Sequence, residues 1–334
     1  MCGLLAGNNF AVAGILTALA LVPSREVWGA EGGYETGAAR LDCRYWRADE
    51  PNRSTAMENP GPLEGVLLPD TDVFRPILAD PREPRFYGDY RRVHFRAPSL
   101  LTEGNGNDID AGMVGAGGEF GLWGLRQPRG CNGLQVSLFA AVFAQFNLSI
   151  SSWDLLNADY LVGPVLTYRH GPWSGRLRVY HQSSHLGDQF LLNYGLANGA
   201  HRPNLGFEAI DLLVSFEGKW WRLYGGGGLV LFSNNDPDLT STPAFVEYGF
   251  ELRGTAWIRL RNSILRPVFG ASFSNFQTTD WTLNVSLGGG LEWASPNATH
   301  RIRALVVAQR GALPFGQFFF QKTQNVGFQF QFEL

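Results

Sequence analysis

The stretch NVGFQFQFEL, residues 325–334, alternates apolar and polar side chains with a period of two. One face carries the large apolar residues Val326, Phe328, Phe330, Phe332 and Leu334, and the other carries the polar residues Gln329, Gln331 and Glu333. Successive side chains of a β-strand point to opposite faces of the sheet. The stretch is therefore predicted to be a strand that separates an apolar environment from a polar one.

The same alternation recurs along the chain from about residue 83, in stretches separated by clusters of Gly, Asn, Asp, Pro and Ser. Such a pattern predicts an all-β fold with many turns. The composition, with 41 Gly and 24 Phe, agrees with this fold class. We expect about twelve strands, within a range of about 10 to 14, at residues 83–96, 109–122, 133–148, 157–170, 173–186, 206–217, 219–232, 244–260, 264–274, 280–294, 298–309 and 324–333.

The lengths of these strands and of their connections indicate a membrane barrel. A strand of a soluble sheet has about 5 to 6 residues, whereas a tilted strand that crosses a bilayer needs about 9 to 11. Connections after even-numbered strands are mostly short, such as HGPWSG and EGKW, and those after odd-numbered strands are long. Outer-membrane barrels have short periplasmic turns and long external loops. We therefore predict a transmembrane antiparallel β-barrel over residues 83–334, with a soluble β-sandwich of long strands as the alternative.

The charge of the chain excludes some classes of protein. Its 334 residues include 27 Lys and Arg against 30 Asp and Glu, for a formal net charge of -3. A near-neutral chain with scattered arginines lacks the basic patch of a nucleic-acid-binding protein. The aromatic content, with 10 Trp and 10 Tyr besides the phenylalanines, is too high for a disordered chain.

The first part of the chain differs from the rest. Residues 10–22 form an apolar segment, FAVAGILTALALV, which is shorter than the roughly 20 residues that a membrane-spanning helix needs. We interpret residues 1–30 as a signal peptide, although its first residues carry no Lys or Arg. Residues 31–82 are rich in proline and charge, so they are predicted to form an extended periplasmic segment before the barrel.

Three cysteines are present, and Cys2 lies in the predicted signal peptide. Cys43 and Cys131 remain in the exported chain, where an oxidising compartment allows them to pair. If the first strand begins in the periplasm, the leader and the turn after the second strand lie on the same side of the membrane. We therefore expect a disulfide between Cys43 and Cys131.

The stretch RLRVYHQSSHLGD, residues 176–188, carries the most informative polar residues of the chain. With a period of two, one face holds Arg176, Arg178, Tyr180, Gln182 and Ser184, and the other holds Leu177, Val179, His181, Ser183 and His185. The interior of a barrel is polar, so the face with Leu and Val is predicted to contact lipid. This orientation assigns the arginines and the tyrosine to a network in the lumen.

On the lipid-facing side, the spacing brings a histidine within reach of a serine hydroxyl. His181 and Ser183 lie two positions apart on one face, about 6 to 7 Å at the backbone, which suits an activated serine. The next strand begins GFEAIDLLVSF, and we expect Glu208 roughly opposite Ser183, from where its carboxylate can orient His181 or His185. The alternative is that these residues are structural polar groups at the membrane interface. A metal site formed by His181 and His185 is disfavoured, because four positions along a strand separate them by about 13 Å.

Two longer segments, VLLPDTDVFRPILADPREPRF (66–86) and VYHQSSHLGDQFLLNY (179–194), resemble a family of bacterial envelope proteins classified only as a domain of unknown function. The resemblance covers most of residues 66–334 and implies an exported, barrel-like organisation. It implies a compartment and no activity. The final strand is also similar to the C-terminal strand of bacterial outer-membrane barrels, which more often ends in an aromatic residue than in Leu.

The motif His181-x-Ser183 on a lipid-facing strand, with a carboxylate on the next strand, is similar to the arrangement in outer-membrane phospholipase A and in the lipid A deacylases. This resemblance implies Ser183 as nucleophile, His181 as general base and Glu208 as the orienting acid, with His185 as a further candidate. In those enzymes Asn-Gly or Asn-Ala usually follows the serine, whereas Ser184 and His185 follow it here.

These observations lead to two hypotheses for function. The first is a bacterial outer-membrane barrel that hydrolyses acyl esters of outer-leaflet lipids, with the barrel assembly machinery as its partner in insertion. The second is a non-enzymatic structural or transport barrel with a polar lumen. Neither hypothesis requires a cofactor, and no residue pattern supports a Ca²⁺ requirement. We expect no nucleic-acid partner, and the sequence leaves the substrate, the pore width and the oligomeric state open.

Overall fold

The structure is a computed structural model that describes residues 62–69, 72–97, 99–102, 106–127, 132–192, 205–234, 243–260, 263–294, 301–314 and 316–333. The predicted signal peptide, Cys43 and Cys131 lie outside the described residues, so the signal peptide and the disulfide stay predictions. No helix within the described residues is long and apolar enough to cross a membrane.

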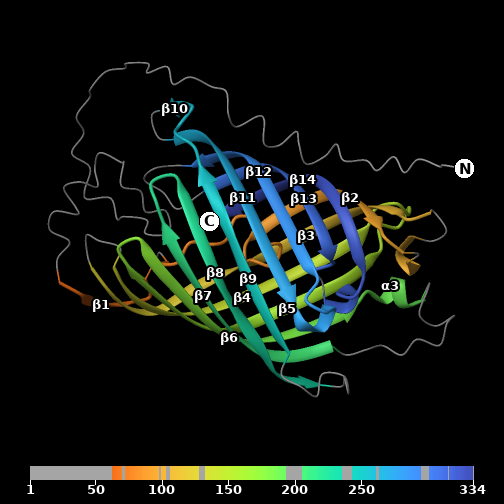
Figure 1. Cartoon of the computed structure of the whole chain (residues 1–334), viewed down its shortest axis with the longest axis horizontal. Helices are drawn as coiled ribbons and strands as arrows, with labels where there is room; N and C mark the ends of the chain where they lie inside the picture. The colour runs from red at the N-terminus through yellow and green to blue at the C-terminus, as the bar shows by residue number, and fades with distance from the viewer. Residues whose placement is uncertain are drawn as a thin grey trace, which may run out of the picture.

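Twelve long antiparallel strands form a closed barrel (Figure 1). Each strand pairs with its neighbours in sequence order, and β14 pairs with β2 to close the sheet. The strands are β2 (Phe86–Phe95), β3 (Asp108–Arg126), β4 (Gly133–Asn147), β5 (Leu155–His170), β6 (Trp173–Leu186), β7 (Leu205–Glu217), β8 (Trp221–Asn234), β9 (Ala244–Arg253), β11 (Ser263–Phe276), β12 (Leu283–Ala294), β13 (Arg301–Ala312) and β14 (Lys322–Glu333).

The all-β barrel and its twelve strands are confirmed, with two short strands in addition. β1 (Glu64–Leu67) pairs with the end of β3 that extends beyond β2. The strand expected at 244–260 is divided, because the chain leaves the barrel after Arg253 and the short β10 (Ile258–Leu260) folds onto β11. At this break the amide of Gly254 donates to the carbonyl of Pro267 at 2.9 Å.

The two ends of the barrel differ in their connections. At one end, here called the turn end, β5 and β6 are joined by residues 171–172, and β7 and β8 by residues 218–220. At the other end, the loop end, the connections include 187–204 and 313–321. The expected alternation of short and long connections is present, except that residues 277–282 at the loop end are short. Figure 1 shows β1 and β10 at the turn end and the short helix α3 (Asp188–Phe190) at the loop end.

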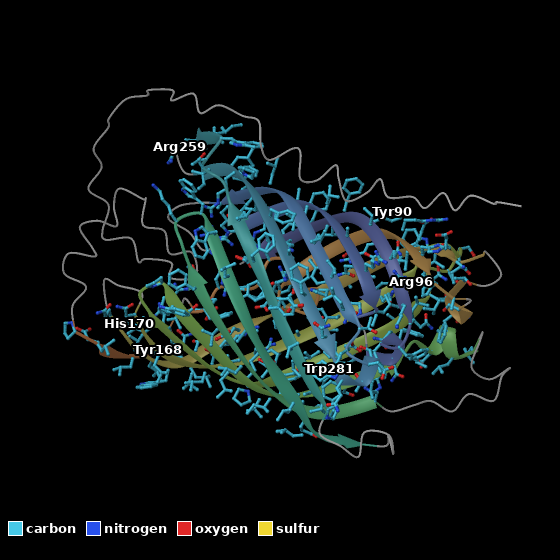
Figure 2. The ribbon with its side chains drawn as sticks, viewed as in Figure 1. Tyr90, Arg96, Tyr168, His170, Arg259 and Trp281 are labelled. Carbon is cyan, nitrogen blue, oxygen red and sulfur yellow. The ribbon has the colours of Figure 1, made fainter. Side chains whose placement is uncertain are left out.

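Outward and inward side chains follow the predicted alternation. Large apolar residues are exposed on the outer surface, where Figure 2 shows Tyr90 and Tyr168 among them. Arginines fill the interior, and the most deeply buried ones are Arg91, Arg169, Arg222 and Arg266. Outer-membrane β-barrels have this arrangement of an apolar outer surface around a polar interior.

A segment of the chain lies inside the barrel, which the sequence did not predict. Residues 72–85 lie between β1 and β2, enter the lumen from the turn end and return to the start of β2. Val73 and Ile77 within this segment are completely buried. The predicted periplasmic segment 31–82 is therefore corrected in its last part, because residues 72–82 are packed within the barrel and do not extend away from it.

Buried ion pairs hold this inserted segment. Arg75 contacts Glu251 at 2.7 Å and Glu217 at 3.5 Å, and the amide of Leu78 donates to Glu251 at 2.6 Å. Arg169 donates to the carbonyl of Val73 and pairs with Glu217, each at 2.8 Å. Charges buried in this way need partners to offset their desolvation. Because these partners come from β5, β7 and β9, the segment ties distant strands together at the turn end.

Candidate active site on the outer face

The three candidate residues of β6 lie on the outer face of the barrel, as predicted. His181 is exposed, and Ser183 and His185 are half-buried. The residues between them point inward, since Gln182 and Ser184 are completely buried in the lumen. The outward orientation follows from the two-residue period of a strand whose other outward residues, such as Val179, are apolar.

Ser183 is hydrogen-bonded to His185. The Oγ atom of Ser183 lies 2.8 Å from Nε2 of His185, within the range of a good hydrogen bond. The ring of His185 meets the ring of Tyr160 on β5 edge to face, with the ring centres 5.9 Å apart. The aromatic contact fixes the ring of His185 in the position from which Nε2 reaches the hydroxyl, which is the geometry of a serine with an adjacent base.

His181 is bonded to the carboxylate expected on the next strand. Its Nδ1 atom lies 3.1 Å from Oε1 of Glu208, and both side chains are exposed by more than two fifths, at 45% and 42%. The register places Glu208 directly opposite His181, whereas Gly206 is opposite Ser183. The expectation that Glu208 faces Ser183 was thus wrong by two residues. Because Glu208 contacts Nδ1 of His181, the other ring nitrogen, Nε2, does not contact this carboxylate.

The site therefore consists of two hydrogen-bonded pairs with Ser183 between the two histidines. His181 and His185 lie two positions before and after the serine on the same face. The structure joins the serine to His185, while the sequence analysis assigned His181 as its base. Among the described residues, no cluster of three or more His, Cys, Asp or Glu side chains is arranged to hold a metal ion.

The surroundings of the site combine lipid-facing and polar surface. Exposed apolar residues lie on the strands around it, with Val162 exposed by 46% and Leu212 by 50%. Ser183 and His185 lie near the end of β6, next to the loop end. The residue opposite Ser183 on β7 is Gly206, which has no side chain. A Cβ atom added to Gly206 would lie 3.7 Å from Cε1 of His181.

The inward residues of β6 form the predicted network in the lumen. Arg176 donates to Glu83 of the inserted segment at 2.5 Å, and Arg178 donates to Asp211 on β7 at 3.0 Å. Ser184 donates to Asn157 at 3.1 Å and also to Asp159. These groups are buried and serve the packing of the barrel.

A second histidine–carboxylate pair on the outer face provides a comparison. Nδ1 of His94 on β2 lies 3.2 Å from Oδ1 of Asp108 on β3, also near the loop end and also exposed. Its distance is close to that of His181 and Glu208. Among the described residues, His94 has no serine hydroxyl as a hydrogen-bond partner. This pair is a matched control for the candidate site.

Residues 49–334 match the family described as Protein of unknown function (DUF1207). The chain belongs to this family. The resemblance to an envelope protein family of unknown function is thereby confirmed. A comparison with curated proteins finds no match.

Several solved structures are similar to this chain in fold. Outer membrane phospholipase A from Escherichia coli is 14% identical, with a TM-score of 0.47, over 75% of this chain and 93% of that chain. The β domain of the Bordetella autotransporter BrkA is 11% identical, with a TM-score of 0.40, over 75% and 98%. LpxR from Salmonella typhimurium is 9% identical, with a TM-score of 0.33, over 73% and 99%. At this level of similarity, the activity has to be argued from the site itself.

Proposed function

We propose that this DUF1207 protein is an outer-membrane acyl hydrolase that cleaves ester bonds of outer-leaflet lipids. The observation that carries the proposal is the 2.8 Å hydrogen bond between Ser183 and His185 on the outer face of the barrel. A serine in the lumen of such a barrel meets water, whereas a serine on its outer face meets lipid. The ester bonds of membrane lipids lie at the level of the interface, and the proposal assigns Ser183, near the loop end of β6, to the same level.

The first half of the reaction is the acylation of Ser183. The Oγ atom attacks the carbonyl carbon of the lipid ester while its proton passes to Nε2 of His185. The tetrahedral intermediate then collapses, the bond to the alcohol oxygen breaks, and that oxygen takes the proton back from His185. The products of this half are a lyso-lipid and an acyl ester on Ser183.

The second half removes the acyl group, and here we assign the second pair. Glu208 accepts the Nδ1 proton of His181, so Nε2 of His181 takes a proton from a water molecule that attacks the acyl carbonyl carbon. The intermediate collapses, the bond to Oγ breaks, and Oγ takes the proton from Nε2 of His181 as the fatty acid leaves. His181 is the base that contacts this carboxylate, at 3.1 Å.

The interior of the barrel argues against the alternative of an open solute channel. The inserted segment 72–85 lies within the turn-end half of the lumen, where Arg75 pairs with Glu217 and Glu251. A channel would require this segment to leave a network of buried ion pairs, and breaking one such pair costs about 3 to 5 kcal/mol.

The test is the release of fatty acid from phospholipid or lipid A in mixed micelles, with and without Ca²⁺. We expect release by the wild-type protein and none above background by the Ser183→Ala variant. His94→Ala is the matched control, because it removes an exposed histidine bonded to a carboxylate at 3.2 Å. Absence of release by a wild-type barrel that shows the heat-dependent gel mobility of a folded barrel would contradict the proposal, as would equal release by Ser183→Ala.

A further inference from the structure

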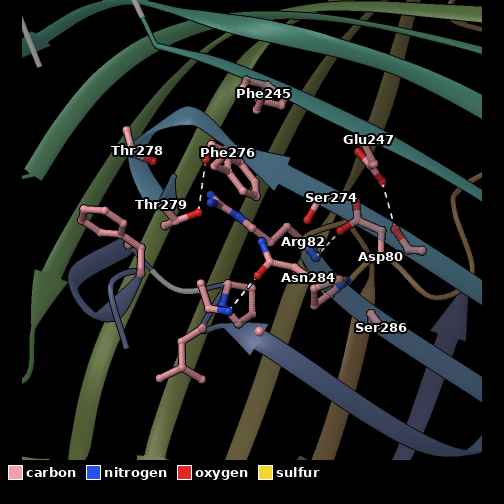
Figure 3. A pocket seen from close by; sticks show the side chains of 18 of the residues that line it. Asp80, Arg82, Phe245, Glu247, Ser274, Phe276, Thr278, Thr279, Asn284 and Ser286 are labelled. Atoms are coloured by element: carbon pink, nitrogen blue, oxygen red, sulfur yellow. Dashed lines mark hydrogen bonds between the residues drawn. The ribbon is translucent and has the colours of Figure 1, made fainter. Parts of the chain in front are cut away.

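The loop-end half of the lumen contains a cavity that no step of the proposed reaction uses. Its volume is about 200 Å³. The tip of the inserted segment, with Asp80, Pro81 and Arg82, forms its inner end, and Ser274 and Phe276 of β11 line its wall. Figure 3 shows Arg82 reaching into this space from the inserted segment. The tip of the inserted segment therefore closes the inner end of the cavity.

Among the charged side chains that line this cavity, the half-buried Asp80, Arg82 and Glu247 have no ion pair within the described residues. The guanidinium of Arg82 donates to the side-chain oxygen of Gln182. Asp80 accepts the amide of Arg82 at 2.9 Å, and Glu247 accepts the hydroxyl of Ser272 at 3.3 Å. Charged groups taken out of water are unfavourable without a partner of opposite charge. Arg75 and Arg169 in the turn-end half of the lumen have carboxylate partners, whereas these three side chains have none within the described residues.

The arrangement of these charges defines the ligand they would complement. Asp80 of the inserted segment and Glu247 of β9 both line this cavity. In Figure 3 both carboxylates lie on the side of the cavity away from the guanidinium of Arg82. Arg178, another cation at the wall, is already engaged with Asp211 at 2.8 Å. Asp80 and Glu247 therefore offer negative charge, and Arg82 offers positive charge, within one cavity.

The walls between the two poles are largely aromatic and apolar. Phe245, Phe276 and Phe319 line the cavity from β9, β11 and the connection between β13 and β14. Aromatic rings attract ammonium groups through their faces and also cover short aliphatic chains. Hydroxyl groups of Ser274 and Thr279 add hydrogen-bonding positions at the wall.

We propose that this cavity binds a small zwitterion, with its ammonium group at Asp80 and Glu247 and its anionic group at Arg82. A planar guanidinium is well suited to a phosphate or a carboxylate. The same chemistry occurs in phosphoethanolamine, the head group of a lipid, and in free α-amino acids. The cavity opens at the loop end, so either source would enter from the side of the membrane that the loops face.

The test is calorimetric binding to the purified full-length Ser183→Ala protein in a non-ionic detergent, because a zwitterionic detergent would compete. The probes are phosphoethanolamine, lysophosphatidylethanolamine and glycine, with ethanolamine and inorganic phosphate as single-charge comparisons. We expect saturable binding of a zwitterionic probe that is stronger than that of either single-charge probe. Phosphoethanolamine and its lyso-lipid identify a head-group site, and glycine identifies an amino-acid site. The Ser183→Ala background separates this test from the proposed hydrolysis.

Two conservative variants decide whether the cavity is responsible. Arg82→Gln and Glu247→Gln should each weaken binding about tenfold or more, the usual effect of losing a hydrogen bond to a charged group. Arg92→Gln is the matched control, since Arg92 pairs with Asp110 on the outer face at 3.1 Å. Heat-dependent gel mobility verifies that each variant is folded. No saturable binding of any zwitterionic probe, or binding that both cavity variants leave unchanged, would overturn the proposal.

Discussion

Ser183 and Ser184 are neighbours in the sequence and occupy opposite faces of the barrel. Ser184 is completely buried and bonded to Asn157 and Asp159 in the lumen. Ser183 is half-buried on the outer face and is hydrogen-bonded to His185. A side chain whose contacts are all buried contributes to stability, whereas an accessible hydroxyl beside an imidazole can react. We therefore propose that the face of the strand, and not the residue type, decides whether a serine of β6 is structural or reactive.

The largest expected effect is the loss of fatty-acid release when the outward serine or its histidine partner is removed. Ser183→Ala and His185→Ala should each reduce fatty-acid release by about 10⁴-fold, because a nucleophile and its base act as a unit. The double variant should lose no more than either single variant. Release rates in mixed micelles check this, with unfolding in urea as the control for stability, which should stay unchanged. Release from Ser183→Ala at the wild-type rate would remove the contrast.

Substitutions on the lumenal face should lower the free energy of unfolding. Glu251→Ala removes the partner of Arg75 and of the Leu78 amide, so we expect a loss of about 3 to 5 kcal/mol in the free energy of unfolding. Glu208→Gln, on the exposed outer face, is the control and should change stability little. Urea unfolding followed by tryptophan fluorescence measures both. Equal stability of the two variants would show that the inserted segment does not hold the barrel together.

The two histidines of the site should differ in which half of the reaction they affect. His181→Ala should lower turnover by about 10² to 10³-fold and leave a burst of lyso-lipid equal to the amount of enzyme, because acylation proceeds without it. His185→Ala should show no burst. His94→Ala should show normal turnover. If His181→Ala abolishes the burst and His185→Ala retains it, then His181 is the base for acylation.

The smallest effect concerns the buried serine. Ser184→Ala should lower the free energy of unfolding by about 1 to 3 kcal/mol, because Asp159 then loses a buried hydrogen bond. Fatty-acid release should stay near the wild-type rate when measured well below the unfolding midpoint. A loss of activity without a loss of stability would mean that Ser184 belongs to the reactive site.

The strands were predictable because alternation along each one reflects a lipid face and a lumenal face. The outward positions of His181 and Ser183 followed from the same pattern. The register of β6 and β7 did not, because the connection over residues 187–204 is too long to fix which residues pair. Glu208 consequently faces His181 and not Ser183.

The inserted segment could not be predicted from the sequence. Residues 72–82 show little periodicity, and their proline and charge made them similar to an exposed leader. Their partners Glu217 and Glu251 are distant in the sequence and lie on the inward faces of strands, where charge alone does not reveal a binding partner. For the same reason, Asp80 and Arg82 were not recognised as part of a cavity.

The most direct test of the central claim is covalent labelling of the folded wild-type barrel with a fluorophosphonate. In this reaction Oγ of an activated serine bonds to phosphorus, fluoride leaves, and the hydroxyl proton passes to the base. Peptide mass spectrometry should find the adduct on Ser183, with labelling retained in Ser184→Ala and His94→Ala and lost in Ser183→Ala. A folded wild-type barrel without an adduct on Ser183, or labelling that Ser183→Ala leaves unchanged, would contradict the account.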